Sequence, residues 1–89
     1  MDAQSTALNL ITSERARQDA KWGEQNHGMG TWLLILMEEV GELSKAALEY
    51  APHGVIAEEA VHVAAVALAI CEHRVRIDRA CSIDGEVGR

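Results

Sequence analysis

The feature that most restricts the fold is a run at residues 60–71 that is apolar at every position except His62. As a helix, this run is apolar on nearly every side, and helices of that kind are buried all round. Three helices of an 89-residue chain can hardly surround it. Because its many alanines permit close approach of another helix, we expect the run to pack against a partner subunit.

The composition also favours helices. Hydrophobic residues make up 48% of the chain, yet there is no Phe, one Tyr and two Trp, so the apolar content is mostly Ala, Leu, Val and Ile. That mixture suits closely packed helices better than a β-sandwich. We therefore expect an all-α fold in one small domain, residues 1–89. A domain this small commonly completes its core by oligomerisation.

Turn signals divide the chain into three expected helices. The first runs from about residue 4 to 21 and ends in a glycine-containing loop at residues 23–30. Thr31 is a plausible N-cap for the second, from about 32 to 50, which Pro52 and Gly54 stop. The third runs from about 55 to 77. Residues 78–89 show no periodicity, and we expect them to form a loose tail outside the core at 4–77.

Charge and hydropathy exclude several classes of protein. The formal net charge of −6 argues against binding a nucleic acid polymer, which needs a basic patch. Charged residues and His interrupt the apolar runs before they reach the ~18–20 residues of a membrane span, and no secretory signal opens the chain. Cys71 and Cys81 are too few for a disulfide framework. We expect a cytoplasmic protein without a membrane partner.

An acidic segment within the second expected helix is the main candidate for chemistry. At about 100° per residue, Glu38, Glu39 and Glu42 spread over roughly 100° of one helix face. Like charges four residues apart destabilise an isolated helix by roughly 0.2–0.5 kcal/mol. A solvated face would tolerate this, but the neighbouring positions are apolar and favour a half-buried cleft. These carboxylates are therefore candidate metal ligands or acid/base groups.

A second acidic group, Glu58 and Glu59, opens the third expected helix, with His62 one turn further on. Alone, the two carboxylates would only compensate the helix dipole, and His62 would be a core residue. Glu59 and His62, three residues apart, could also bind one metal, as such pairs do in helix bundles. If the second and third helices are antiparallel, both acidic groups can face one cleft, and converging carboxylates suit a hard divalent cation.

Aromatic and basic residues beside the glycine loop suggest a ligand of a particular kind. Lys21 could hold a phosphate, while Trp22 and Trp32 could stack on a base, although two tryptophans could equally fill the core of a small bundle. Asn26 and His27 could simply be turn formers. The chain has no phosphate-binding glycine loop followed by Lys-Ser/Thr, no His-Glu-x-x-His and no zinc-finger spacing.

Two motifs together resemble a known family. The segment EEVGEL at residues 38–43, followed by EEAVH at 58–62, resembles the E-E-x-x-E … E-x-x-D pattern of the MazG-like all-α nucleoside triphosphate pyrophosphohydrolases. The segment ERARQDAKWGEQNH at residues 14–27 looks like the lead-in of the small phage- and integron-type members. The similarity covers about residues 10–77, and the first motif is the more specific one.

The resemblance implies a fold, an activity and a set of site residues. It implies three helices that pair with a partner subunit into a four-helix-bundle-like homodimer or homotetramer. It also implies hydrolysis of a nucleoside triphosphate between the α and β phosphates with Mg²⁺, or Mn²⁺. Matched position by position, Glu39, Glu42 and Glu59 correspond to metal-binding positions and Glu38 to the leading acidic residue. Lys21 and Trp22 fall where this subgroup would contact phosphate and base.

One departure from the pattern matters for function. His62 stands where the family has Asp, and Mg²⁺ prefers oxygen ligands to imidazole nitrogen. His62 could therefore favour Mn²⁺ or another transition metal, contact the substrate, or mark a loss of catalysis. Two hypotheses follow: a metal-dependent pyrophosphohydrolase, with Glu38 orienting the attacking water, or a catalytically degenerate helical oligomer that binds a nucleotide or a protein. A purely structural helical dimer with solvated carboxylates is a third.

Overall fold

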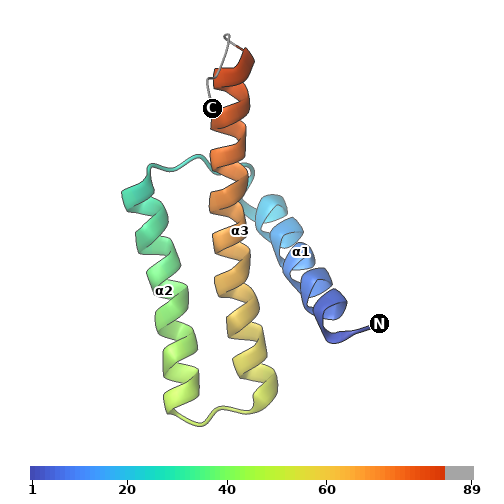
Figure 1. Cartoon of the computed structure of the whole chain (residues 1–89). Helices are drawn as coiled ribbons and strands as arrows, with labels where there is room; N and C mark the ends of the chain where they lie inside the picture. The colour runs from blue at the N-terminus through green and yellow to red at the C-terminus, as the bar shows by residue number, and fades with distance from the viewer. Residues whose placement is uncertain (84–89) are drawn as a thin grey trace.

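The computed structural model describes residues 1–83 and consists of three α-helices (Figure 1). They are α1 (Ala3–Trp22), α2 (Met29–Leu48) and α3 (His53–Ile83). The described range contains no β-strand, which confirms the predicted all-α class.

Helix α3 lies between the other two. Both α1 and α2 pack against α3, whereas the backbones of α1 and α2 lie apart from each other (Figure 1). A short connection joins α2 to α3, and the two run antiparallel, as expected. The loop between α1 and α2 crosses α3, so the first two helices lie on different sides of it.

The helix boundaries agree with the sequence at α1 and differ at α2. Asp2 caps α1 by accepting a 2.7 Å hydrogen bond from the Ser5 backbone N–H. Helix α2 begins at Met29 with Gly28 as N-cap, so the expectation that Thr31 caps this helix is wrong. The backbone N–H of Trp32 already donates to the Gly28 carbonyl at 3.0 Å, which places Thr31 inside the first turn.

Helix α3 is longer than predicted at both ends. The carbonyl of Pro52 accepts from the backbone N–H groups of Val55 and Ile56, so the helix starts at His53, directly after the proline. At the other end it continues to Ile83, which corrects the expectation that the tail begins at residue 78. No glycine or proline occurs between residues 78 and 83 to stop it. Residues 84–89 of the expected tail lie outside the described range.

The apolar core of the single chain is small. Its buried apolar side chains in the described range are two on α2, Trp32 and Ala46, and three on α3, Ala65, Val66 and Ala69. Helix α2 carries a second apolar stripe, Leu34, Met37 and Leu48, which lies roughly opposite the first at helical spacing and is exposed. An apolar face of this kind is typical of an interaction surface.

Polar side chains hold α1 against α3. The buried residues of α1 are Arg15 and Gln18. The Arg15 guanidinium donates to both oxygens of Glu72 on α3, at 2.5 Å and 3.1 Å, to Asp19 at 3.0 Å and to the Gln18 side chain at 3.0 Å. Glu72 in turn raises the pKa of Arg15. The pairing is bidentate, the strongest geometry available to an arginine and a carboxylate.

The hydropathy of α3 corrects one expectation. The segment His53–Cys81 has the length and hydropathy of a membrane-spanning helix, with a mean hydropathy of 1.8, although we expected no apolar run of that length. Only 17% of the apolar window is buried in the single chain. Core helices of soluble proteins meet the same criterion, so the absence of a membrane partner stays a prediction.

We expect Arg15→Met to lower the free energy of unfolding by about 2–3 kcal/mol, because it leaves Glu72 partly buried without its cation. The estimate allows for a Glu72 side chain that is 36% exposed. Urea denaturation followed by circular dichroism measures the change, with Arg74→Met, at an exposed position of α3, as control. Replacing Arg15 and Glu72 together by Met and Leu should recover part of the loss. Equal stability of Arg15→Met and the wild type would contradict this description of the α1–α3 contact.

Candidate metal centre

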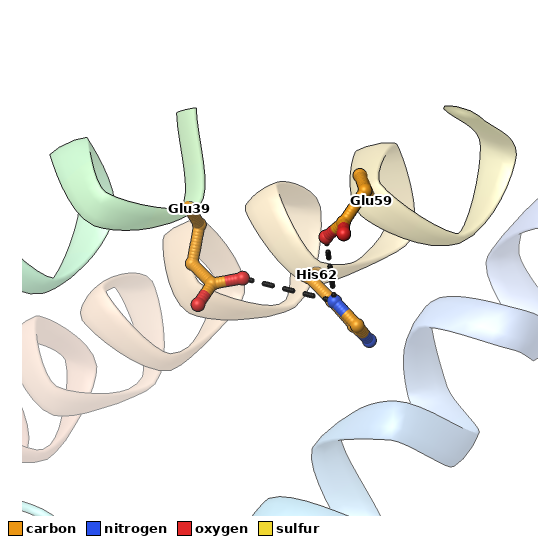
Figure 2. A group of neighbouring side chains, drawn as sticks. All are labelled: Glu39, Glu59 and His62. Atoms are coloured by element: carbon orange, nitrogen blue, oxygen red, sulfur yellow. Dashed lines mark hydrogen bonds and ion pairs between the residues drawn. The ribbon is translucent and has the colours of Figure 1, made fainter. Parts of the chain in front are cut away.

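Three of the predicted site residues meet between α2 and α3. The side chains of Glu39, Glu59 and His62 each offer a ligand atom, and these atoms lie within 4.8 Å of one another (Figure 2). His62 Nδ1 is 3.1 Å from Glu59 Oε1 and 3.7 Å from Glu39 Oε2. Figure 2 shows Glu39 approaching from α2, while Glu59 and His62 share a face of α3. The two acidic segments therefore face each other, as their sequence positions suggested.

The packing of α2 explains why Glu39 takes part. Its inward stripe repeats at helical spacing through Trp32, Ile35, Leu36, Val40 and Leu43, all of which are buried or half-buried. Glu39 lies within this stripe and is directed at α3, whereas Glu38 and Glu42 lie beside it and are exposed. On α3, Glu59 and His62 are three residues apart and therefore on one face.

The environment of Glu39 is unfavourable to its negative charge. Its side chain is 30% exposed, and desolvation raises its pKa, with further increases from Glu59, Glu42 and Glu38. The neighbouring His62 acts in the opposite direction. In the described chain, neither Glu39 nor Glu59 forms an ion pair with Lys or Arg. A partly buried carboxylate surrounded by other carboxylates is typical of a functional site.

The donor set fits a divalent cation. Atoms bound to one ion at about 2.0–2.2 Å lie no more than about 4.4 Å apart. The cluster at 4.8 Å therefore needs to close by only a few tenths of an ångström. Two carboxylate oxygens and an imidazole nitrogen suit transition metals such as Mn²⁺ better than Mg²⁺. Glu42 is not one of the three clustered residues, although it is near enough to raise the pKa of Glu39.

A pocket of about 420 Å³ adjoins the cluster. All three helices contribute to its wall, which includes Glu39 and His62 of the cluster and the predicted catalytic residue Glu38. The remaining lining residues are Glu14, Arg17, Gln18, Trp22, Gln25, Trp32, Ile35, Val66 and Ala69. Its size lies within the range of about 300–1,000 Å³ that is usual for small-molecule sites.

The two tryptophans have different environments. Trp32 is 1% exposed, and its indole N–H donates to His73 Nδ1 at 2.9 Å, so it fills the core while one part lines the pocket. The His27 ring packs against it in a T-shaped arrangement, with 4.7 Å between ring centroids. Trp22 also lines the pocket and is 55% exposed, so it offers an accessible aromatic surface.

Lys21 lies outside the pocket wall. Its ammonium group sits over the Trp22 ring, 4.6 Å from the centroid, in cation–π geometry. The arginine that does line the pocket is Arg17, one turn earlier on α1. The sequence does not distinguish Arg17, because the second half of α1 is rich in charged residues of both signs.

The loop at residues 23–28 is attached to α3. Arg76 donates to the Gln25 carbonyl at 3.0 Å and to the Asn26 side chain at 3.1 Å. The Gln25 side chain is 2.8 Å from His27 Nε2 and lines the pocket. Asn26 and His27 are thus more than turn formers, since Asn26 binds Arg76 of α3 and His27 packs against Trp32 of α2. The contacts with Arg76 have no signal in a single sequence, because the partners are about 50 residues apart.

Comparison with protein-family models, curated proteins and solved structures finds no match to this chain. The family resemblance of the two acidic motifs therefore stays a prediction.

We expect Glu39→Gln to have opposite effects on stability and on metal binding. Without metal, the substitution removes a desolvated charge and should raise the melting temperature. It should also weaken Mn²⁺ binding, measured by calorimetry, by at least about tenfold. Glu49→Gln, at an exposed position at the end of α2, serves as control and should change neither property. A lower melting temperature with unchanged Mn²⁺ affinity would refute the metal centre.

The raised pKa of Glu39 predicts how pH changes the stability of the metal-free protein. Glu39 has a higher pKa in the folded chain than when unfolded, so the folded state takes up its proton first as the pH falls. The ionised Glu39 carboxylate therefore destabilises the folded state above its folded pKa, and this destabilisation disappears as the pH drops through that pKa. The stability difference between Glu39→Gln and the wild type should therefore shrink on acidification. Thermal unfolding of both proteins from pH 8 to pH 5 tests this, and a difference that widens would be inconsistent with it.

Proposed function

We propose that this chain is a metal-dependent nucleoside triphosphate pyrophosphohydrolase of the MazG-like type. It would cleave a (d)NTP between the α and β phosphates to (d)NMP and pyrophosphate. The observation that carries the proposal is the convergence of Glu39, Glu59 and His62 beside a pocket with an accessible aromatic surface. The two acidic motifs that resemble this family in sequence supply the three residues of the cluster, and this supports the same assignment.

The shape and chemistry of the pocket support a nucleotide as ligand. Its volume of about 420 Å³ suits a molecule of that size. Trp22 offers a partly exposed ring at one side, and aromatic rings stack on nucleobases of any sequence. Glu38 and Glu39 also line the pocket, and a triphosphate could approach these carboxylates only with a cation between the two negative groups. The aromatic ring would hold the base, and the cation would hold the phosphates.

The side chains would divide the work of hydrolysis between them. Glu39, Glu59 and His62 would hold the divalent ion, which supplies positive charge to the phosphate oxygens when bound. Glu38 is exposed, lines the pocket and lies outside the cluster, so its carboxylate can accept a proton from an attacking water. Glu42 would add negative charge one turn away, which strengthens cation binding.

His62 points to Mn²⁺ as the preferred ion rather than Mg²⁺. Mg²⁺ requires near-ideal octahedral oxygen coordination, whereas imidazole is a good ligand for transition metals. His62 lies within 3.1 Å of Glu59 and takes a central place in the cluster (Figure 2). We therefore assign His62 as a metal ligand, at the position where the MazG-like pattern has an aspartate.

The oligomer is part of the proposal as well. The exposed stripe of Leu34, Met37 and Leu48 on α2 offers a second packing face, and small residues between them would let another helix approach. We infer a four-helix-bundle-like homodimer or homotetramer in which this face is covered. A cytoplasmic location accords with the exposed thiols of Cys71 and Cys81.

We expect pyrophosphate release from at least one member of a panel of canonical NTPs and dNTPs in the presence of Mn²⁺. Glu39→Gln should lower the rate by at least about 100-fold, because it removes a ligand charge. A coupled pyrophosphate assay measures both, and Glu49→Gln provides the control at an exposed position of like charge. Absence of turnover of every nucleotide with either Mn²⁺ or Mg²⁺ would reject catalysis. Nucleotide binding that persisted in that case would favour the degenerate, binding-only relative.

We expect His62→Asp to change the choice of metal. Replacing the imidazole with a carboxylate gives an all-oxygen donor set, so the ratio of Mg²⁺-supported to Mn²⁺-supported activity should rise by at least about tenfold. Rates at saturating concentrations of each ion give this ratio. If His62→Asp instead creates activity that the wild type lacks with any ion, the natural protein is catalytically degenerate. An unchanged ratio would show that His62 is not a ligand.

A further inference from the structure

The pocket beside the metal centre contains one basic side chain of the Lys/Arg type among the described residues that line it, Arg17. Arg17 also lines a second pocket of about 410 Å³ between α1 and α3, and the two pockets share Glu14 and His62 as well. The guanidinium therefore lies where the two spaces meet, next to the cluster. Glu39 is close enough to raise the pKa of Arg17, after the larger effect of Glu14.

Glu14 fixes the position of this arginine. Arg17 Nε donates to Glu14 Oε1 at 2.8 Å and its terminal nitrogen to Glu14 Oε2 at 2.6 Å, a bidentate pair. The Gln18 side chain also donates to Glu14, at 3.3 Å. The Glu14 side chain is 11% exposed and that of Arg17 is 54% exposed. The carboxylate is thus the more buried partner, and Arg17 is the exposed partner in the pocket wall.

The pairing leaves Arg17 with capacity for another anion. A guanidinium has five N–H groups, and the bond to Glu14 uses two of them. Its planar fork matches phosphate oxygens, and an arginine held in advance loses less entropy on binding. Arg15 contrasts with it, since that side chain is 10% exposed and donates to Glu72, Asp19 and Gln18.

We propose that Arg17, positioned by Glu14, binds the phosphate chain of the ligand beside the metal centre. This inference rests on the proposed function, because it assigns a phosphate contact within the same site. It replaces Lys21 in that role, since Lys21 stacks on Trp22 and lies outside the pocket wall. Arg17 also lies near the Trp22 ring, with its guanidinium carbon 6.0 Å from the ring centroid.

The test compares Arg17→Gln with Lys21→Gln, which remove equal charge from neighbouring turns of α1. Titration of inorganic tripolyphosphate in the presence of Mn²⁺, followed by calorimetry, measures the affinity. We expect Arg17→Gln to weaken tripolyphosphate binding at least tenfold and Lys21→Gln to weaken it less than threefold. Arg17→Lys, which keeps the charge but not the fork, should fall between Arg17→Gln and the wild type. Mn²⁺ alone should bind Arg17→Gln at least as tightly as the wild type, because the lost charge is positive.

Several results would overturn the assignment. Equal tripolyphosphate affinities of Arg17→Gln and the wild type would do so, as would an equal or larger loss in Lys21→Gln. So would failure of the wild type to bind tripolyphosphate while Mn²⁺ binds. Wild-type binding that depends on Arg17, without turnover of any nucleotide, would leave the phosphate contact standing and reject the catalytic proposal instead.

The role of Glu14 as a positioning residue has its own readout. Glu14→Gln keeps the positive charge of Arg17 but loses the charged bidentate partner. If turnover is observed, KM for the nucleotide should rise three- to tenfold, with kcat changed less than twofold. A drop in kcat at constant KM would place Glu14 elsewhere in the reaction and overturn the positioning role.

Discussion

The structure depends on a single constraint: α3 provides the packing surface for both other helices, whose backbones do not pack against each other. A helix with apolar residues on nearly every side can accept neighbours on two faces. The consequence is a pocket that residues of all three helices line. The candidate site residues Glu38, Glu39 and His62 belong to its wall. The candidate site and the small size of the core therefore both follow from the position of α3 between the other two helices.

Helices α1 and α2 pack against α3 through different kinds of interaction. Helix α2 packs through an apolar stripe, in which Glu39 is the exception and carries a raised pKa as a result. Helix α1 packs through the Arg15–Glu72 pair, in which each charged group is bound to its counter-charge. Charge is thus neutralised on the α1 side and left unneutralised on the α2 side. An uncompensated carboxylate reduces stability, and proteins retain such groups where function requires them. A divalent cation is the partner that would remove this cost.

The sequence predicted much of this arrangement, and the omissions have physical reasons. Three helices followed from periodicity, and the short connection predicted that the acidic groups of the second and third helices could face one cleft. The pattern did not separate Glu39 from Glu42 as a member of the cluster. The roles of Arg15 and Arg17 did not follow. The buried face of α1 repeats at helical spacing through polar residues, so a search for apolar periodicity cannot find it. Contacts between the loop and Arg76 join distant parts of the chain, and local pattern carries no information on them.

The acidic segment of α2 shows where sequence reasoning could have gone further. Glu38, Glu39 and Glu42 were treated as one group, yet the apolar stripe that includes Ile35 and Val40 contains only Glu39. Comparison of each carboxylate with that stripe would have separated the inward residue from the two exposed ones. Helix α2 begins after Gly28 and not after Thr31, and α3 ends at Ile83 and not near residue 77. The boundaries of helices are the part of a fold that local sequence encodes most weakly.

The central claim is that side chains of α2 and α3 hold one divalent cation through oxygen and nitrogen donors. Pulsed electron paramagnetic resonance of Mn²⁺ bound to the full chain tests it most directly, since it detects a directly coordinated imidazole nitrogen. The account predicts one bound Mn²⁺ per chain with a histidine nitrogen coupling that disappears in His62→Gln and persists in His73→Gln. Mn²⁺ that binds without nitrogen coupling, or a coupling that survives in His62→Gln, would contradict it.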